Sequence, residues 1–552
     1  LSPMPTPFDL YLSKLEADLR GGKATEYTHR FALELLLESL APGVAASSDP
    51  KHIACGAPDF IVERGQIPLG YVETKDVGDD LDKTERGPQL KRYRTSLNNL
   101  MLTDYVEFRW YVGGDRRMSA RLATVGKNGK LTRDPQGMAA AAQLFAEFYQ
   151  VEVPTVGTPK ELAGRMAALT RIVGDLIAGA LREEDETGVF HRQLAAFRQL
   201  LLPALTPAEF ADIYAQTMAY GLFAARVIAP TAAQFSRADA YKHLPPANPL
   251  LRRLFMDVGE ELDDTPIAPF LDDLAALLAR ADMAAILQEF GKRTRTEDPV
   301  VHFYETFLAA YDPKLREGRG VYYTPEPVVQ FIVNSVDSLL KSHFQRPLGL
   351  ADPNTLLLDP ATGTATFLYY VIRRIHETQM ARGQGGAWNG YVRDHLLPRV
   401  FGFELLMAPY AVAHLKLGLL LAELGYTFGK HERLGVFLTN TLEEAVTHAQ
   451  TLGLAGYLSE EGNEAAKVKN DTPIMVVLGN PPYSGHSANK GEWIGGLVRD
   501  YYFVDGAPLG ERNPKWLQDD YVKFIRFAQW RIEQTGHGIL AFITNHGYLD
   551  NP

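Results

Sequence analysis

The stretch that decides the fold of the C-terminal half is LLLDPATGTATF, residues Leu356–Phe367. It is typical of a buried strand (Thr355–Asp359), a tight turn of small residues and the start of a helix. Alternation of such strands with helices predicts a parallel, doubly wound sheet, with ligands at the carboxyl ends of the strands. The further apolar runs that complete the sheet are Val400–Glu404, Gly435–Leu438, Ile474–Leu478 and Gly538–Ile543.

Polar residues end three of these predicted strands. Asp359 ends the first, and the small residues after it let a ligand approach the backbone closely. Glu404 ends the second, at a spacing that suits a carboxylate binding ribose hydroxyls. Asn480 follows the fourth, and two prolines behind it restrict the backbone. The Asn480 amide and a neighbouring carbonyl could therefore accept from one NH₂ group, while Tyr483 offers a flat face to a base. No GxxxxGK[ST] phosphate loop occurs in the sequence.

These segments, over about residues 318–548, resemble the N6-adenine DNA methyltransferases in their γ order of motifs. The resemblance implies S-adenosylmethionine as cofactor and a catalytic motif formed by Asn480, Pro481, Pro482 and Tyr483. The residues that it assigns to cofactor binding are Tyr323, Thr324, Pro325, Asp359, Ala361, Gly363, Phe367, Glu404, Asn440 and Leu442.

Two details of this resemblance carry structural expectations. Thr324 is expected to cap a helix, with Pro325 in its first turn. The second glycine of the family's cofactor loop is Ala365 here, which adds a methyl group near the cofactor and bears on its affinity.

The N-terminal region reads as mixed α/β, and two of its predicted strands carry acidic residues. Pro58–Glu63 and Leu69–Lys75 are joined by a Gly65 turn, so a hairpin would bring Asp59 and Glu73 together. Glu73 and Lys75 would share one face of their strand. Two carboxylates with an open face can hold Mg²⁺. Lys75 could orient or deprotonate an attacking water, while the metal offsets charge on the phosphate.

A helix after this hairpin strengthens the pattern. Gln89 and Tyr93 lie four residues apart and therefore on one helix face. Over about residues 20–125 the sequence resembles the PD-(D/E)xK nucleases that carry a QxxxY helix. The resemblance implies catalytic roles for Asp59, Glu73, Lys75 and Gln89, with Asp59 and Glu73 as metal ligands. Weaker candidates are Glu26 as a further carboxylate and Lys91 and Arg92 as phosphate contacts or solvated charges. The alternative without a catalytic role is a surface hairpin with a solvated Glu–Lys pair.

The sequence between these regions predicts only helices and contains no chemical motif. The predicted helices are Asp175–Arg182, Glu209–Val227, Leu250–Leu262 and Leu271–Phe290. The predicted architecture is multidomain α/β: a PD-(D/E)xK nuclease core at 1–155, an all-α connector at 156–312, and a Rossmann-like class I methyltransferase at 313–552. Because the sequence stops directly after a strand, we expect it to be part of a longer protein. The target-recognition domain is then expected beyond residue 552, with Tyr548 the only late aromatic candidate for stacking on a flipped base.

Composition bounds the function classes. The 552 residues carry 56 basic and 67 acidic side chains, so a protein that is basic over its whole surface is excluded, while a local basic groove is not. Uninterrupted apolar stretches of membrane-spanning length are absent from the sequence. The most apolar stretch, Ala411–Leu424, is interrupted by His414, Lys416 and Glu423. A single cysteine, Cys55, excludes a disulfide framework and a multi-cysteine zinc site, and fits a reducing cytoplasm.

The order nuclease, connector, methyltransferase resembles single-chain restriction–modification enzymes. GVYYTPEPVV and DPATGTATFL look most like Type ISP enzymes, but the missing phosphate loop favours the shorter, ATP-independent Type IIG/IIL plan. This resemblance implies methylation of adenine N6 in duplex DNA after base flipping, Mg²⁺-dependent cleavage of unmethylated DNA, and a place in the bacterial cytoplasm at the nucleoid. It implies no membrane association. A transient dimer on DNA is a hypothesis, since one nuclease centre cuts one strand.

Three other functions remain open on the sequence. One is a methylation-only phage-defence protein with an inactive or partner-dependent nuclease domain. The second is an N5-glutamine protein methyltransferase, which shares the Asn-Pro-Pro-Tyr motif because it also methylates a planar amide nitrogen. The third, a pure binding module, would leave two catalytic constellations idle.

Overall fold

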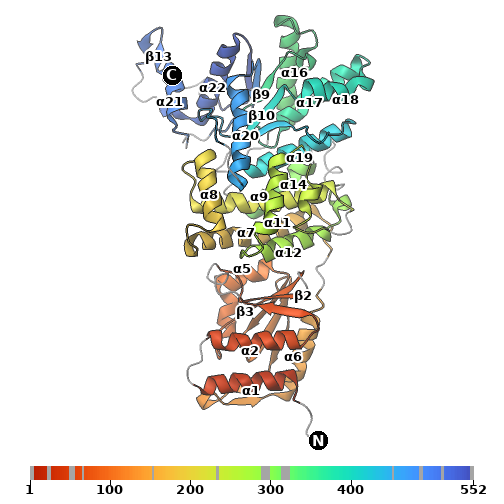
Figure 1. Cartoon of the computed structure of the whole chain (residues 1–552), viewed down its shortest axis with the longest axis vertical. Helices are drawn as coiled ribbons and strands as arrows, with labels where there is room; N and C mark the ends of the chain where they lie inside the picture. Colours follow the sequence, from red (N-terminus) through yellow and green to blue (C-terminus); the bar gives the residue numbers. More distant parts are fainter. Residues whose placement is uncertain are drawn as a thin grey trace.

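The structure is a computed structural model of the whole chain, and it has an elongated shape with three regions stacked along one axis (Figure 1). We call them the N-terminal domain, the helical connector and the C-terminal domain. No helix of the described chain is long and apolar enough to cross a membrane. The described residues are 5–21, 26–48, 56–64, 67–151, 155–231, 235–245, 247–287, 299–312, 324–449, 453–483, 489–510 and 515–546.

The N-terminal domain is built on one mixed sheet. Among the described residues it has the strand order β1-β2-β3-β4-β5-β6, with only the β3–β4 pair parallel. Helices α1, α2 and α6 pack on one face, around the side chains of Phe60, Val72 and Met101. Helices α4 and α5 lie on the opposite face, with Tyr71 and Leu100. The bounds are α1 Pro7–Arg20, α2 Glu26–Ser39, β1 Val44–Ser47, β2 Phe60–Arg64, β3 Ile67–Thr74, α4 Leu81–Arg86, α5 Pro88–Ser96, β4 Asn99–Thr103, β5 Glu107–Val112, β6 Asp115–Arg121, β7 Ala123–Val125, β8 Leu131–Arg133 and α6 Pro135–Phe148.

The described part of the connector, from residue 155 to residue 312, forms helices and loops and contains no strand. Its helices start at strong local signals: Thr158 accepts a hydrogen bond from the Glu161 main-chain N–H, and Thr206 and Glu209 form a capping box. Both of these helices, α7 and α9, have a proline in the first turn, where its missing N–H has no partner to lose. The bounds are α7 Pro159–Glu183, α8 Val189–Leu200, α9 Pro207–Ile228, α10 Ala240–His243, α11 Pro249–Glu261, α12 Ala268–Ala279 and α14 Pro299–Tyr311.

The C-terminal domain contains the predicted parallel sheet. In the described residues its strand order is β11-β10-β9-β12-β15, and every pair is parallel. The chain leaves β9 toward β10 on one side and returns to β12 on the other, so the order reverses beside β9. The bounds are α16 Glu326–His343, β9 Leu357–Asp359, α17 Thr366–Ala381, α18 Trp388–Tyr391, β10 Val400–Glu404, α19 Met407–Glu423, β11 Gly435–Leu438, α20 Gly453–Asn470, β12 Val476–Gly479, α21 Glu492–Val498, β13 Phe503–Val504, β14 Ala507–Pro508, α22 Asp520–Thr535 and β15 Ile539–Phe542.

Helices cover both faces of this sheet. Helices α16, α17 and α19 share a core with Leu357 and Val476, whereas α21 and α22 pack with Leu358 and Val477. Since neighbouring residues of a strand point to opposite faces, burial on both sides requires continuous apolar runs. This explains why these strands are recognisable in the sequence.

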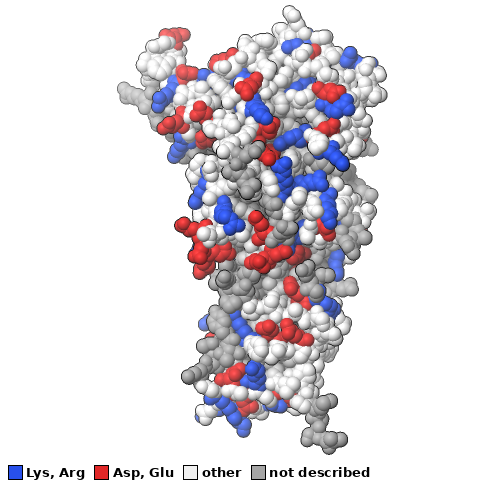
Figure 2. Space-filling view, in the orientation of Figure 1, with Lys and Arg blue, Asp and Glu red and all other residues white. Residues whose placement is uncertain are grey.

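The connector packs against both sheets. On one side, the Phe270 ring of α12 stacks on Tyr71 of β3, with ring centroids 5.2 Å apart, and the Tyr71 hydroxyl donates to Asp273 at 2.7 Å. On the other side, the Leu434 N–H donates to the Ala247 carbonyl at 3.4 Å. On the face drawn in Figure 2, acidic side chains gather over the part of the connector nearest the N-terminal sheet.

Some predicted elements differ from those observed. Residues 44–47 form β1 and residues 99–103 form β4, and the sequence analysis predicted neither strand. The helix predicted at Asp175–Arg182 is the end of the much longer α7. The helix predicted at Leu271–Phe290 is also wrong in extent, because α12 ends at Ala279.

Candidate functional site

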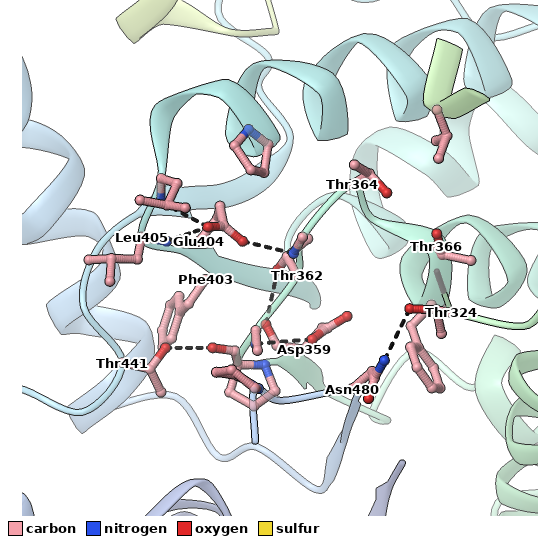
Figure 3. A pocket seen from close by; sticks show the side chains of 18 of the residues that line it. Thr324, Asp359, Thr362, Thr364, Thr366, Phe403, Glu404, Leu405, Thr441 and Asn480 are labelled. Atoms are coloured by element: carbon pink, nitrogen blue, oxygen red, sulfur yellow. Dashed lines mark hydrogen bonds between the residues drawn. The ribbon is translucent and has the colours of Figure 1, made fainter. Parts of the chain in front are cut away.

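A cavity of about 450 Å³ opens at the carboxyl ends of β9, β10 and β12, where the strand order reverses. It is lined by residues that follow each of these strands and by side chains of α14 and α19. Figure 3 shows Glu404 and Thr441 on one side of it, and Thr324, Thr364 and Thr366 on the other. The cavity therefore has two distinct ends, with Asp359 between them.

Asp359 lies at the end of β9 with its side chain fully buried. Its Oδ1 accepts from the Ala361 main-chain N–H at 3.1 Å. Burial raises the pKa of Asp359 to about 8, and the nearby Glu404 carboxylate adds to the increase. A Cβ atom on Gly479 would lie 2.6 Å from Asp359 Oδ1, so the neighbouring strand must carry glycine there. The carboxyl group is thus tightly enclosed, and its burial favours the neutral form.

Glu404 is held by main-chain N–H groups. Its Oε2 accepts from Gly363 at 2.8 Å, and its Oε1 accepts from Leu405 and Leu406 at 2.9 and 2.8 Å. Burial raises its pKa, against the stabilising effect of these three donors. A carboxylate has about four lone-pair positions, so Glu404 can still accept one further hydrogen bond, as a ribose hydroxyl would require.

The loop after β11 is fixed from both sides. Asn440 Oδ1 accepts from the Leu442 N–H at 3.1 Å, and Thr441 donates to the Pro360 carbonyl at 2.6 Å. The buried ammonium of Lys469 donates to the carbonyls of Asn440 and Glu443 at 3.0 and 2.7 Å. Burial lowers the pKa of Lys469 to about 7. These contacts hold Asn440 and Thr441 at the wall of the cavity.

In the side-chain amide of Asn480, the nitrogen is hydrogen-bonded and the oxygen is available. Its Nδ2 donates to Thr324 Oγ1 at 3.2 Å, which fixes the orientation of the amide. Among the described residues, its buried Oδ1 has no hydrogen-bond partner. The predicted role of Thr324 as a helix cap is wrong: Pro325 is the N-cap of α16, and Thr324 lines the cavity instead. A buried acceptor without a donor is costly and suggests a ligand that supplies one.

Ala365 adopts the left-handed conformation, with φ 63° and ψ 33°. L-residues with a Cβ adopt this conformation at a cost of roughly 1–2 kcal/mol. The turn before α17 therefore keeps a glycine-like backbone although its residue is alanine.

Most of the predicted cofactor-binding residues come together. Those that line the cavity are Thr324, Asp359, Ala361, Gly363, Phe367, Glu404 and Asn440. Pro325 and Leu442 are not among the lining residues, and Leu442 is buried in the core beside α22. Pro482 lines the cavity with Asn480, whereas Pro481 and Tyr483 do not. Cys55, Tyr323, Tyr548 and the side chain of Glu26 lie outside the described residues.

The sequence analysis did not identify several lining residues. Lys416 of α19 lines the cavity, and its only signal was a charge inside an apolar helix. His302 and Glu305 of α14 belong to a region where no motif was found. Phe524 of α22 is part of an amphipathic helix without a motif.

The N-terminal candidate residues lie at the start of β2 and at the end of β3. Thr74 donates to Asp59 Oδ2 through its main-chain N–H at 2.6 Å and its hydroxyl at 2.8 Å, which ties Asp59 to the end of β3. Arg30 of α2 donates to Asp59 Oδ1 at 2.6 Å. Burial raises the pKa of Asp59, while Thr74 and Arg30 oppose the increase. Asp59 and Glu73 are only 4% and 3% exposed.

Glu73 and Lys75 pair on one face of the sheet, at 2.6 Å. Gln89 donates to the Tyr93 hydroxyl at 3.3 Å, and Tyr93 donates to the Gly56 carbonyl at 2.7 Å. Burial and the nearby Glu73 carboxylate raise the pKa of Tyr93 to about 12. The helix that carries Gln89 and Tyr93 therefore lies close to Glu73. Arg92, predicted as a phosphate contact or a solvated charge, pairs with Asp175 of the connector at 2.7 Å.

The site around Asp59 and Glu73 has suitable ligand atoms for a magnesium ion, but these atoms already have partners. Carboxylate oxygens are the ligands that Mg²⁺ prefers. However, Asp59 is already paired with Arg30, and Glu73 with Lys75. Among the described residues, no group of three or more His, Cys, Asp or Glu side chains could hold a metal. The donor atoms fit the ion, and the charge of the centre is already balanced by the chain.

Comparisons with known proteins agree with the C-terminal geometry. Residues 295–550 match the family model for N-6 DNA methylases. No curated protein matches the sequence. A solved DrdV–DNA complex is 23% identical, with a TM-score of 0.50, and the match covers 99% of this chain and 50% of that one.

Two Type ISP restriction–modification enzymes, one bound to DNA and one in complex with a DNA substrate mimic, also match. The ATP-dependent LlaBIII is 21% identical with a TM-score of 0.55, covering 76% of this chain and 27% of that one. A nuclease-deletion mutant of LlaGI is 20% identical with a TM-score of 0.54, covering 74% and 31%. This chain spans half or less of the length of these proteins. The similarity identifies a multidomain α/β fold with a methyltransferase-like domain.

Proposed function

We propose that the C-terminal domain methylates adenine N6 in a specific DNA site with S-adenosylmethionine. The observation that carries this proposal is the buried Asn480 Oδ1, a fixed acceptor without a donor at the edge of the cavity, in a domain that matches the family model for N-6 DNA methylases. An exocyclic amine has its lone pair delocalised into the ring and is a weak nucleophile. An acceptor for one of its hydrogens favours the tetrahedral nitrogen of the transition state.

Other residues of the cavity would bind the cofactor and orient Asn480. Glu404 would accept from a ribose hydroxyl, and Asn440 and Thr441 would contact the adenine of the cofactor. S-adenosylmethionine supplies a methyl group on a positively charged sulfur. Thr324 keeps the Asn480 amide from rotating, so its oxygen faces the incoming amine. The target adenine must leave the duplex to reach this position.

The N-terminal domain supports a second proposal, a Mg²⁺-dependent nuclease that cuts unmethylated DNA. Its support is that Asp59 is bonded to the end of β3, which carries the Glu73–Lys75 pair, and that Tyr93, the partner of Gln89, lies near Glu73. Bound Mg²⁺ would offset charge on the cleaved phosphate. Lys75 would orient the attacking water from the same strand face as Glu73. The whole chain would then act as a restriction–modification enzyme.

One observation favours a different role for this domain. Each acidic residue of the centre is paired with a cation of the chain, as expected of a protein that only methylates.

The deciding experiment incubates the full-length protein with unmethylated plasmid and Mg²⁺, with and without S-adenosylmethionine and ATP. Breaks and labelled N6-methyladenine are scored together. Breaks with methylation and without ATP support both proposals. Methylation without breaks leaves a methylation-only enzyme, and no methylation of DNA rejects the first proposal.

A further inference from the structure

A lysine stands inside the cavity of the C-terminal domain. Lys416 belongs to α19, a helix whose side chains are almost all buried, and it is only 4% exposed. Among the described residues that line the cavity, Lys416 is the only lysine or arginine. Burial of an ammonium group is expensive, and this one lies in a largely apolar helix at the wall of the cavity.

The end of the cavity that contains Lys416 can be identified. Its Nζ lies 3.4 Å from Thr366 Oγ1 and 4.9 Å from the centre of the Tyr369 ring. Thr366 is the first residue of α17, on the side opposite to Glu404 and Thr441 (Figure 3). If Glu404 and Thr441 contact the nucleoside, the amino-acid end of the cofactor extends toward Thr366 and Lys416.

We propose that Lys416 binds the carboxylate of the methionine moiety of S-adenosylmethionine. This inference rests on the proposed methyltransferase function. In it, the Lys416 ammonium is the group that recognises the amino-acid end of the cofactor. That end is a zwitterion, and the cavity presents both signs of charge, since the carboxylates of Glu305 and Glu326 also line it. A charge-assisted hydrogen bond from a buried ammonium to a carboxylate is among the stronger polar contacts in proteins.

The test compares two ligands that differ only in this carboxylate. Calorimetric titration of the full-length protein with S-adenosylmethionine and with its decarboxylated analogue measures the dissociation constant of each. The wild-type protein should bind S-adenosylmethionine at least about tenfold more tightly than the analogue. In Lys416→Met, affinity for S-adenosylmethionine should fall about 10- to 100-fold, while affinity for the analogue stays within about twofold.

Controls separate the outcomes. Lys430→Met removes an exposed lysine and should change neither constant. Lys416→Arg, which keeps the charge, should retain most of the preference and decides the question if the methionine variant does not fold. An equal loss for both ligands, or no preference in the wild type, overturns the assignment of Lys416. If the wild type binds neither ligand, the proposed methyltransferase function itself is wrong.

Discussion

The two candidate sites of this chain satisfy their polar groups in opposite ways. In the N-terminal domain, Asp59 and Glu73 are each paired with a cation of the protein, Arg30 and Lys75. In the C-terminal cavity, Glu404 is held by main-chain N–H groups, and Asn480 keeps an oxygen without a donor. A metal ion at the N-terminal site must compete with these cations for the carboxylates, whereas a donor that reaches the Asn480 oxygen gains a contact.

The largest effect should come from Asn480→Ala, which removes the unsatisfied acceptor. We expect the rate of DNA methylation to fall by about 100- to 1000-fold, because the contact acts in the transition state. Binding of S-adenosylmethionine, measured by calorimetry, and DNA cleavage should not change. Asn354→Ala, at an exposed position, is the control. Near-normal methylation by Asn480→Ala would remove the main support for the proposed mechanism.

Glu73→Gln removes a proposed metal-binding carboxylate from the N-terminal site. Loss of the carboxylate should lower the rate of plasmid cleavage by about 100-fold or more, since metal-assisted charge stabilisation contributes several kcal/mol. Methylation of the same plasmid should stay at the wild-type level. The exposed Glu147→Gln is a matched control within the domain. Unchanged cleavage in Glu73→Gln would place the nuclease activity elsewhere.

Arg30→Met tests whether the N-terminal centre is a metal site or only a buried ion pair. Removal of one partner of a buried pair costs about 3–5 kcal/mol of unfolding free energy. If Asp59 binds Mg²⁺, millimolar Mg²⁺ should restore part of this loss in thermal unfolding, and more than it stabilises the wild type. Arg20→Met breaks an exposed pair with Glu16 and should cost less than about 1 kcal/mol. A loss that Mg²⁺ does not restore would identify the pair as structural.

The raised pKa of Asp359 predicts how the affinity for S-adenosylmethionine depends on pH. Its raised pKa keeps the carboxyl neutral below about pH 8, while a cationic ligand prefers the ionised form. Affinity for S-adenosylmethionine should therefore increase between pH 6 and pH 8, by roughly tenfold, and level off above. Calorimetry of Asp359→Asn over the same range removes the contribution of the ligand's own titration. Equal pH profiles for the two proteins would contradict this role.

The smallest effect should be at Ala365. Glycine removes the cost of the left-handed conformation, so Ala365→Gly should raise the free energy of unfolding by about 0.5–1 kcal/mol. Ala381→Gly, at the end of the same helix with ordinary helical geometry, should lower it by up to about 1 kcal/mol. Thermal unfolding of the two variants compares them directly. Shifts of the same sign would show that the strain at Ala365 is not significant.

The sequence predicted the C-terminal sheet well for a physical reason. Its strands are buried on both faces, so β10 and β11 stand out as the apolar runs Val400–Glu404 and Gly435–Leu438. In the N-terminal sheet, β1 (VAAS) is short and half exposed, and β4 (NLMLT) begins with asparagine. Such strands depend on their neighbours in the fold, which periodicity does not reveal.

The candidate sites show the same limit. Motif residues such as Asp359, Glu404 and Asn480 could be predicted because strand ends meet at one edge of a parallel sheet. The bond between Thr324 and Asn480 joins segments 156 residues apart, and nothing local indicates it. Lys416 carried a weak signal, a charge in an apolar helix, that the analysis did not connect with the site.

The stacking of Tyr71 on Phe270 has a consequence for engineering. Tyr71 and Glu73 occupy the same face of β3, so the strand that presents the acidic group is anchored to the connector two residues away. A chimera that exchanges the N-terminal module must therefore transplant Phe270 and Asp273 together with it, or supply an equivalent aromatic partner. An exchange at the loop before α7 would separate Tyr71 from both of these partners.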